Sequence, residues 1–558
     1  MRAFVFCELC LRLTAAFQLF RGPWPNCRLT TMPARVGLVQ EACPAAGSVE
    51  IGYVTDIEGN INYFDKWVEQ SGVLRYSAPG VLELTHPLAY FVFGGDAIDR
   101  GPGNLRLLRR LVALKHSAPE RVFFLAGNRD LNKLRMSSEL DDADLSRPFT
   151  EIPRPHWDAN VPSLAEYLEA LAAERGTIAS ELDCRAERLR WMYKHTLGCP
   201  DTFEFWRTEL ALLSDRNTNE VGDEEVVAET LASVMPGGLV RQYLELASAA
   251  VLLGQTLFVH GAVDERNMQF VPDDSTRFCL PEEPQGGSYV STVAEWVDGL
   301  NGFLTRGLAD HARRPEWDAQ RSSRGGEQLL ALQNREAMWG RSIVSNCYCD
   351  GSTITSARAA EERQKLRSSP VTNASQFKLV CSDPRDAKVA KWLLGEGVRR
   401  VVVGHKPSGD CPSVLSHTYT GVEVLSVDTS YSDIDFGDSR GAAVAGLVLR
   451  GPFDANHAVV YGKLRDGRRH ETRLSCLGGD AHGSGGDPFV GTELDGGWWV
   501  KARVQPDEVG HETQYLCVRG AGRSYTVAFH SAAKLESLSR PLLARTAPSR
   551  RSVMNSFS

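Results

Sequence analysis

Five short apolar segments of the chain each run directly into side chains of the kinds that bind metal ions. These side chains are Asp56 and Glu58, Asp96 and Asp99, Asn128 and Asp130, His260, and His405. A glycine lies beside each group, which lets the backbone turn sharply there. Carboxylate, amide and imidazole groups together suit hard to borderline divalent cations. Two such ions, about 3.5–4 Å apart, clamp a phosphate and ionise a water between them. One carboxylate must then bridge the ions, and we expect Asp96 to be that bridge.

Each of these residues also has a structural interpretation without chemistry. Acidic and amide side chains that follow strands often cap helices, and Glu58 could turn away from the others to do so. A lone buried histidine is more often a satisfied core residue, and Arg129 could be a simple salt-bridge partner of the acids. The ordered set argues against capping alone, because unpaired buried acids are costly.

The apolar segments are predicted to be buried strands, because they are short and rich in β-branched residues. They span 49–55, 89–93, 121–126, 256–259, 399–403, 423–427, 442–449 and 458–461. Between them, Asn104 is predicted to cap one helix, and Asp383 with Pro384 to open another. This alternation predicts an α/β fold, a layered β-sheet core flanked by helices. In such sheets ligands bind outside the carboxyl ends of the strands, where the candidate ligands lie.

Composition divides the chain into four segments. Residues 1–45 form an N-terminal extension, 46–475 the α/β domain, 476–538 a small β unit after a Gly-rich linker, and 539–558 a basic tail predicted to be disordered. Two stretches, about 135–255 and 262–378, interrupt the strand–helix rhythm. We interpret both as insertions on the core, and the first is largely helical in pattern, for instance over 164–173 and 240–251.

The bulk composition excludes several classes of function. The 558 residues carry a formal net charge of −8, so no broad basic surface is expected for nucleic acid or anionic membrane. No run is apolar enough over roughly 18–20 residues to span a membrane. The 13 cysteines are scattered and odd in number, which favours reduced thiols over a disulfide framework.

The N-terminal extension bears on location. It is a poor secretory signal, because Glu8, Arg12 and Gln18 interrupt its apolar residues. Two interpretations stay open: a basic amphipathic organelle presequence, or a non-native extension with Met32 as the true start. We expect a cytoplasmic protein, or a mitochondrial one if the extension is native.

In order and placement, the candidate ligands resemble the motif series of the calcineurin-like metallophosphoesterase superfamily. That series reads Gly-Asp-x-His-Gly, Gly-Asp-x-x-Asp-Arg-Gly, Gly-Asn-His-Asp/Glu, His-Gly and Gly-His. Its order and its placement at strand ends are reproduced from Asp56 to His405, within roughly Val49 to Tyr461. The nearest branches by motif are the serine/threonine phosphoprotein phosphatases and the diadenosine tetraphosphatases, through Asp96 to Gly101 and the pair His260-Gly261.

The resemblance implies a role for each matching residue. One ion would be held by Asp56, Glu58 and Asp96, and a second by Asp96, Asn128, His260 and His405. Arg100 would grip phosphate oxygens, as a bidentate guanidinium does well. Asp99 would orient the neighbouring catalytic group. We expect two divalent ions, Mn²⁺ or Mg²⁺, with iron or zinc as alternatives.

Two residues depart from the motif series. Glu58 stands where the family has histidine, and its carboxylate shifts the preference toward Mg²⁺ or Mn²⁺. Arg129 stands where the family has the histidine proposed as general acid, and arginine cannot give up a proton at neutral pH. Three features could compensate for the missing general acid: a good leaving group that needs no acid, charge stabilisation by Arg129, or Asp130 as the acid if burial raises its pKa.

Further candidates for substrate binding are Lys406 and Arg341, each of which could equally be structural. The residues favour a metal-dependent hydrolase of phosphate esters or anhydrides, acting on a nucleotide or another small phospho-compound. The alternatives are a serine/threonine phosphoprotein phosphatase and a catalytically weak protein that binds a phosphorylated ligand.

Overall fold

The structure, a computed structural model, describes a defined set of residues. These are 48–152, 154, 161–263, 267–275, 286–332, 387–405, 409–415, 421–429, 443–477, 485–494, 498–506, 512–521 and 524–538. All of them belong to the compact unit Val39–Ser558. Arg341, Lys406, the predicted helix start at Asp383, the extension of residues 1–45 and the tail of residues 539–558 lie outside the described residues.

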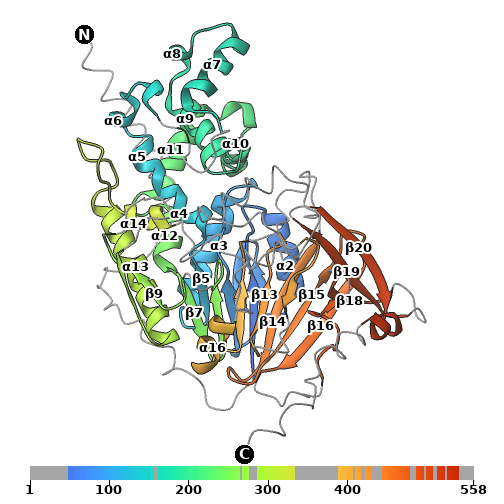
Figure 1. The fold of residues 1–558 in the computed structure, drawn as a ribbon. Coiled ribbons are helices and arrows are strands. Elements are labelled where there is room, and N and C mark those ends of the chain that lie inside the picture. Colours follow the sequence, from blue (N-terminus) through green and yellow to red (C-terminus); the bar gives the residue numbers. More distant parts are fainter. Residues whose placement is uncertain are drawn as a thin grey trace, which may run out of the picture. The chain divides into compact units, whose positions relative to one another are not determined.

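The larger of two main β-sheets has eleven described strands, in the order β20-β19-β18-β16-β15-β14-β1-β4-β5-β6 with β17 beside β18 (Figure 1). They are β1 (Val49–Val54), β4 (Ala89–Phe93), β5 (Val122–Leu125), β6 (Ala247–Ser248), β14 (Val444–Gly451), β15 (His457–Lys463), β16 (Arg469–Cys476), β17 (Glu493–Leu494), β18 (Trp498–Val504), β19 (Gln514–Ala521) and β20 (Ser524–Ser531). β1, β4 and β5 pair in parallel, with Val54 opposite Phe93 and Phe93 opposite Phe124. Their carboxyl ends therefore share one edge of the sheet.

The second main sheet has five described strands, in the order β12-β13-β11-β8-β7. They are β7 (Ala250–Leu253), β8 (Thr256–Val259), β11 (Arg400–Val403), β12 (Ser413–Leu415) and β13 (Glu423–Ser426). β8, β11 and β13 are parallel, and Val403 lies opposite both Val259 and Ser426. Two short hairpins stand apart from the main sheets, β2 (Leu74–Ala78) with β3 (Val81–Leu84) and β9 (Phe270–Pro272) with β10 (Gly287–Tyr289).

The two main sheets pack face to face. Side chains of a strand alternate between its two faces, so every second residue of β1 and β4 points to the same side. Tyr53 of β1 stacks on Phe258 of β8 with ring centroids 5.8 Å apart, and Val402 of β11 joins the same buried cluster. This apolar layer holds the carboxyl ends of both sets of parallel strands close together.

Helices cover the outer faces of the sheets. They include α2 (Ile61–Ser71), α3 (Asn104–Ser117), α13 (Val293–Arg313), α14 (Glu327–Leu332) and α16 (Ala387–Gly395). Trp67 of α2 packs on Phe91 of β4 at 5.5 Å between ring centroids, and Trp296 of α13 meets Trp392 of α16 at 5.8 Å. Helices outside two packed sheets confirm the predicted layered α/β fold.

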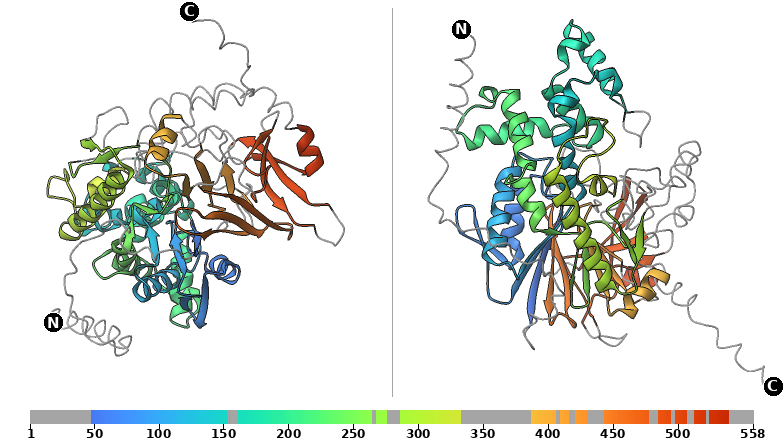
Figure 2. Two further views of the ribbon diagram at one scale, coloured as in Figure 1. Left: turned by 90° about the horizontal axis from the view of Figure 1, so that it is seen from below. Right: turned by 90° about the vertical axis from the view of Figure 1, so that its left-hand side faces the viewer.

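The chain between β5 and β6 is helical, and it gathers at one end of the strands (Figure 2). Its helices are α4 (Asn128–Asn132), α5 (Met136–Glu139), α6 (Asp142–Leu145), α7 (Leu164–Arg175), α8 (Ala179–Leu182), α9 (Arg185–Trp191), α10 (Thr202–Leu213), α11 (Asp223–Val234) and α12 (Leu239–Leu246). Most of them share a buried core of their own around Trp191 and Trp206. The helical pattern over 240–251 was wrong at its end, because α12 stops at Leu246 and residues 247–253 form β6 and β7. Periodicity alone does not separate a short buried strand from a buried helix end.

The strands predicted beyond the Gly-rich linker extend the large sheet. His470 of β16 lies opposite Val504 of β18, and β18 to β20 then pair in antiparallel order. Among the described helices, none has the length and hydrophobicity that a membrane span requires.

A buried histidine links α12 and α13 to the turn at Leu134. Burial lowers the pKa of His311, on α13, to about 4, and the charge of Arg241 adds to the effect. Nη1 of Arg241 lies 3.1 Å from Nδ1 of His311, so this nitrogen must accept and stay unprotonated. The other ring nitrogen donates to the carbonyl oxygen of Leu134 at 3.1 Å.

We therefore predict that His311 makes the fold sensitive to acid. The unfolded chain takes up a proton near pH 6.5 and the folded chain only near pH 4, so the stability that His311 confers is complete above pH 6.5. It declines as the pH falls toward 4, by up to about 3 kcal/mol. Urea unfolding of wild type and His311→Gln at several pH values measures this. Parallel stability–pH curves for the two proteins would contradict it.

Candidate metal centre

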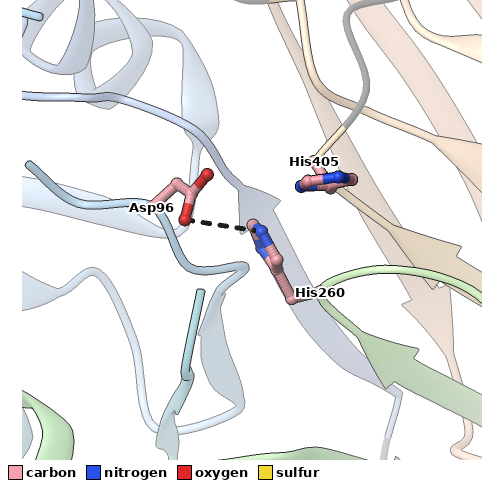
Figure 3. Close-up of side chains that lie close together, drawn as sticks. All are labelled: Asp96, His260 and His405. Atoms are coloured by element: carbon pink, nitrogen blue, oxygen red, sulfur yellow. Dashed lines mark ion pairs between the residues drawn. The ribbon is translucent and has the colours of Figure 1, made fainter. Parts of the chain in front are cut away.

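The carboxyl ends of the parallel strands of both sheets meet at one place. Asp56 follows β1, Asp96 follows β4 and Asn128 follows β5, while His260 follows β8 and His405 follows β11. In Figure 3, Asp96 and His260 face each other and the His405 ring lies beside them. The structure thus brings together side chains that are up to 349 positions apart in sequence.

The backbone at this edge is strained in a consistent way. Asp56, Glu58, Asp96 and His405 have φ angles of 54°, 49°, 53° and 68°. Residues other than glycine rarely adopt this left-handed region, and such strain gathers at functional sites. A Cβ at Gly127 would lie 2.2 Å from the backbone nitrogen of Asp96, so only glycine permits the close approach of these two turns.

His260 is held so that one ring nitrogen faces the centre. Its Nδ1 donates to the carbonyl oxygen of Gly94 at 2.8 Å, which leaves Nε2 3.1 Å from Oδ1 of Asn128 and 3.4 Å from Oδ1 of Asp96. Anchoring one nitrogen in this way is typical of histidines that bind metals through the other. The His405 ring lies 5.2 Å from the His260 ring.

Burial disfavours the charged form of His260, but Asp96 and Asp56 outweigh it and raise its pKa to about 10. Burial would raise the pKa of Asp96, but the contact with His260 and the charge of Arg129 outweigh it and hold the pKa of Asp96 below the usual range. A metal ion at Nε2 must therefore displace this proton, as metals generally do at histidine ligands.

Asp56, Glu58 and Asp96 form a second cluster, and all three are buried. Oδ2 of Asp56 accepts from the backbone nitrogen of His405 at 2.9 Å. Burial and the neighbouring Asp428 raise the pKa of Asp56 well above its usual value.

Asp428 was not predicted as a site residue. It lies two residues beyond β13, whose neighbour β11 ends beside His405, and it is 1% exposed. The signal was available, because a polar residue after a buried strand is the pattern that identified the other candidates.

Arg129 lies among the acids. Its Nε is 2.9 Å from Oε1 of Glu58 and 3.6 Å from Oδ2 of Asp96, and its Nη1 is 3.3 Å from Oδ2 of Asp99. The buried Lys133 binds the same Asp99 oxygen at 2.8 Å. Asp99 therefore positions two positively charged side chains, Arg129 and Lys133, beside the carboxylates.

The helical segment between β5 and β6 touches this centre directly. Nη2 of Arg100 donates to the carbonyl oxygen of Gly198 at 2.9 Å, and the Thr202 hydroxyl donates to the carbonyl oxygen of Asp99 at 2.8 Å. The carboxylate of Glu209, on α10, accepts the backbone N–H groups of Leu105 and Arg106 at 2.9 Å each.

The prediction that Asn104 caps α3 was wrong. Gly103 holds the cap position, Glu209 satisfies the first amides of the helix, and Oδ1 of Asn104 accepts from the backbone nitrogen of Asp99 at 2.9 Å. A carboxylate from a distant helix thus replaces a local cap.

Asp130 is bonded to the backbone on both oxygens. It accepts from the nitrogens of Asp96 and Ala97 at 2.9 Å each, and from that of Gly127 at 3.1 Å. Burial and the charge of Asp96 raise the pKa of Asp130 to about 7. These bonds fix the two turns that carry Asp96 and Asn128, which makes Asp130 a positioning residue.

Residues 49–231 match the sequence profile of the calcineurin-like phosphoesterases. This chain carries a calcineurin-like metallophosphoesterase domain. No curated protein sequence matches the chain significantly.

Several solved structures align with this chain at low sequence identity. A cold-active protein-tyrosine phosphatase of a psychrophilic Shewanella species has 14% identity over 76% of this chain and 80% of its own, with a TM-score of 0.33. A protein serine/threonine phosphatase from Saccharomyces cerevisiae has 11% identity over 72% of both chains, with a TM-score of 0.28. A metallophosphoesterase from Sphaerobacter thermophilus has 9% identity over 72% and 83%, with a TM-score of 0.22.

The side chains at this centre form two groups, and the group with the two imidazoles fits a metal ion of the kind that the family binds. Potential ligand atoms of Asp96, His260 and His405 lie within 4.8 Å of one another, as do those of Asp56, Glu58 and Asp96. Asp96 is common to both groups, which is the position expected of a bridging carboxylate. Carboxylates with imidazoles suit a divalent cation of borderline hardness.

Because Asp130 positions Asp96, we predict that Asp130→Asn weakens metal binding by this domain without removing a ligand. An amide cannot accept from backbone N–H groups on both of its heavy atoms, so one buried donor loses its partner at a cost of about 1–3 kcal/mol. Losing such a supporting contact typically costs about 10- to 100-fold in metal affinity.

Titration calorimetry with Mn²⁺ and chemical unfolding measure the two effects. Asp466→Asn is a matched control, because the exposed Asp466 also accepts a backbone N–H, that of Arg468 at 3.0 Å, far from any candidate ligand. Unchanged Mn²⁺ affinity in Asp130→Asn would contradict the positioning role.

Proposed function

We propose that the metallophosphoesterase domain hydrolyses a phosphate ester or anhydride with a good leaving group, such as the phosphate of a nucleotide or another small phospho-compound. The observation that carries the proposal is the state of Arg129 and Asp130, the two residues considered above as sources of a proton or a positive charge for the leaving group. Arg129 keeps its charge, and Asp130 already accepts backbone N–H groups on both oxygens. A leaving group that departs without protonation suits such a centre.

A divalent ion bound at Asp96, Asn128, His260 and His405 would supply a nucleophilic water and polarise a phosphoryl oxygen. We propose Mn²⁺ or Mg²⁺ for this role. Asn128 and His260 orient toward the same point, and Asp130 fixes the turns behind it. Arg100 and Arg129 present guanidinium groups, which bind phosphate oxygens well and neutralise charge on the departing group.

If neither Arg129 nor Asp130 donates a proton, kcat should depend strongly on the leaving group. Across a series of aryl phosphates, we expect the rate of the wild type to fall steeply as the pKa of the leaving phenol rises. Arg129→His supplies a proton donor, and it should improve the poorest substrates relative to the best by about 10²- to 10⁴-fold.

Arg135→His is the matched control for this series. Arg135 forms an ion pair with Glu139, 2.8 Å between Nε and Oε1, and neither residue is a candidate ligand. It should leave the slope unchanged. A shallow slope in the wild type would show that another group donates the proton.

The candidate ligands predict a metal requirement and a substrate preference. With Mn²⁺ the purified chain should hydrolyse nitrophenyl phosphate and dinucleoside polyphosphates, and Asp96→Asn should reduce kcat by at least about 10³-fold because it removes a carboxylate ligand of the ion. The exposed Asp454 offers a control, and Asp454→Asn should be unaffected.

Release of phosphate from phosphopeptides but not from dinucleoside polyphosphates would overturn the substrate preference in favour of a phosphoprotein phosphatase. Tight binding of a phosphorylated compound without turnover at any divalent metal would indicate a binding protein instead.

A further inference from the structure

The two residues that depart from the family motif contact each other. Glu58 and Arg129 both replace histidines, and Nε of Arg129 lies 2.9 Å from Oε1 of Glu58. The side chains are 4% and 15% exposed, so this ion pair is largely screened from water. The two replacements therefore form one joint change at the centre.

The guanidinium of Arg129 lies where the first of the two ions would be bound. It contacts Glu58 and also Asp96, at 3.6 Å, and these are two of the three carboxylates assigned to that ion. Arg100 approaches the other oxygen of Glu58, with its Nε 3.4 Å from Oε2. Both oxygens of Glu58 thus face positive charge from the protein itself.

Arg129 is fixed at this place by several contacts. Its backbone nitrogen donates to Oδ1 of Asp96 at 2.8 Å, its carbonyl oxygen accepts from Lys133 at 2.9 Å, and its Nη1 donates to Asp99. The third carboxylate, Asp56, also has protein donors on one oxygen, from Thr55 and from the backbone of His405. The protein thus supplies the countercharge that an ion would otherwise bring.

The group of Asp96, His260 and His405 has different neighbours. Its two imidazoles are groups that can bind a metal ion, and Asn128 adds an amide oxygen. A guanidinium carries a permanent charge and has no lone pair to offer, so it competes with an ion where an imidazole would bind one.

We propose that the centre binds a single divalent ion, at Asp96, Asn128, His260 and His405, and that the guanidinium of Arg129 takes the place of the second ion beside Glu58. This inference rests on the metal-dependent function proposed above. Arg129 then supplies positive charge next to the phosphoryl group without a second metal.

Metal content tests this directly on the full chain. Wild type is saturated with Mn²⁺, freed of excess ion, and examined by elemental analysis and by electron paramagnetic resonance. We expect a single Mn²⁺ per chain with the six-line signal of an isolated ion. Glu58→His with Arg129→His, and separately Arg129→Met, should double the Mn²⁺ content and give the spectrum of two coupled ions.

Arg129→Met nearly preserves side-chain length and needs no second substitution, so it keeps the test open if the double variant fails to fold. The matched control is Glu83→His with Arg75→His, because this pair is also in direct contact, at 2.6 Å, but is exposed. It should leave the Mn²⁺ content unchanged.

A coupled pair of ions in the wild type would overturn the inference, and so would a single ion in both Arg129 variants. If the wild type binds two ions and hydrolyses phosphate compounds, the proposed function survives while the one-ion centre does not. A single ion in the wild type, a pair in the variants, and no hydrolysis of any phosphate compound would support the inference and remove the function.

Discussion

Buried carboxylates need donors or cations, and six of them gather at one edge of the two sheets in this protein. Asp56, Glu58, Asp96, Asp99, Asp130 and Asp428 are each at most 3% exposed. Leaving a single such charge without compensation costs several kcal/mol. The chain meets this demand in three ways: backbone N–H groups bind Asp130, arginine and lysine bind Glu58 and Asp99, and an imidazole faces Asp96. The arrangement of the surrounding turns is a result of these pairings.

The same demand explains why the fold carries strain at this edge. A strand that simply continued past Asp96 would carry the carboxylate away from its partners. The left-handed backbone at Asp56, Glu58 and Asp96 turns the chain back within one residue. Glycines at the neighbouring positions leave room for one turn against the next, as Gly404 does against Asp56, where a Cβ would lie 2.5 Å from Oδ2. Packing between the sheets holds the strained turns in place.

Much of this arrangement could be predicted from the sequence. The apolar runs before Asp56, Asp96, Asn128, His260 and His405 identify buried strands, and parallel strands bring the residues at their carboxyl ends to one edge of a sheet. The sequence indicated that Arg129 could pair with the acids, but not that its partner is Glu58, because the two residues lie far apart in the chain. Nor could it show that Glu209 caps α3, since a contact across about a hundred residues leaves no local pattern. Asp428, by contrast, could have been predicted, because it follows a predicted strand as the other candidate ligands do.

The helical segment between β5 and β6 has a consequence for how the domain can vary. Gly198 orients Arg100, Thr202 holds the turn at Asp99, and Glu209 completes the first turn of α3. A shortened chain that omitted these helices would expose amides at the start of α3 and remove the contact that holds the Arg100 side chain. The short stretch that contacts the core is therefore constrained, whereas evolution could reshape the outer helices of the segment far more freely.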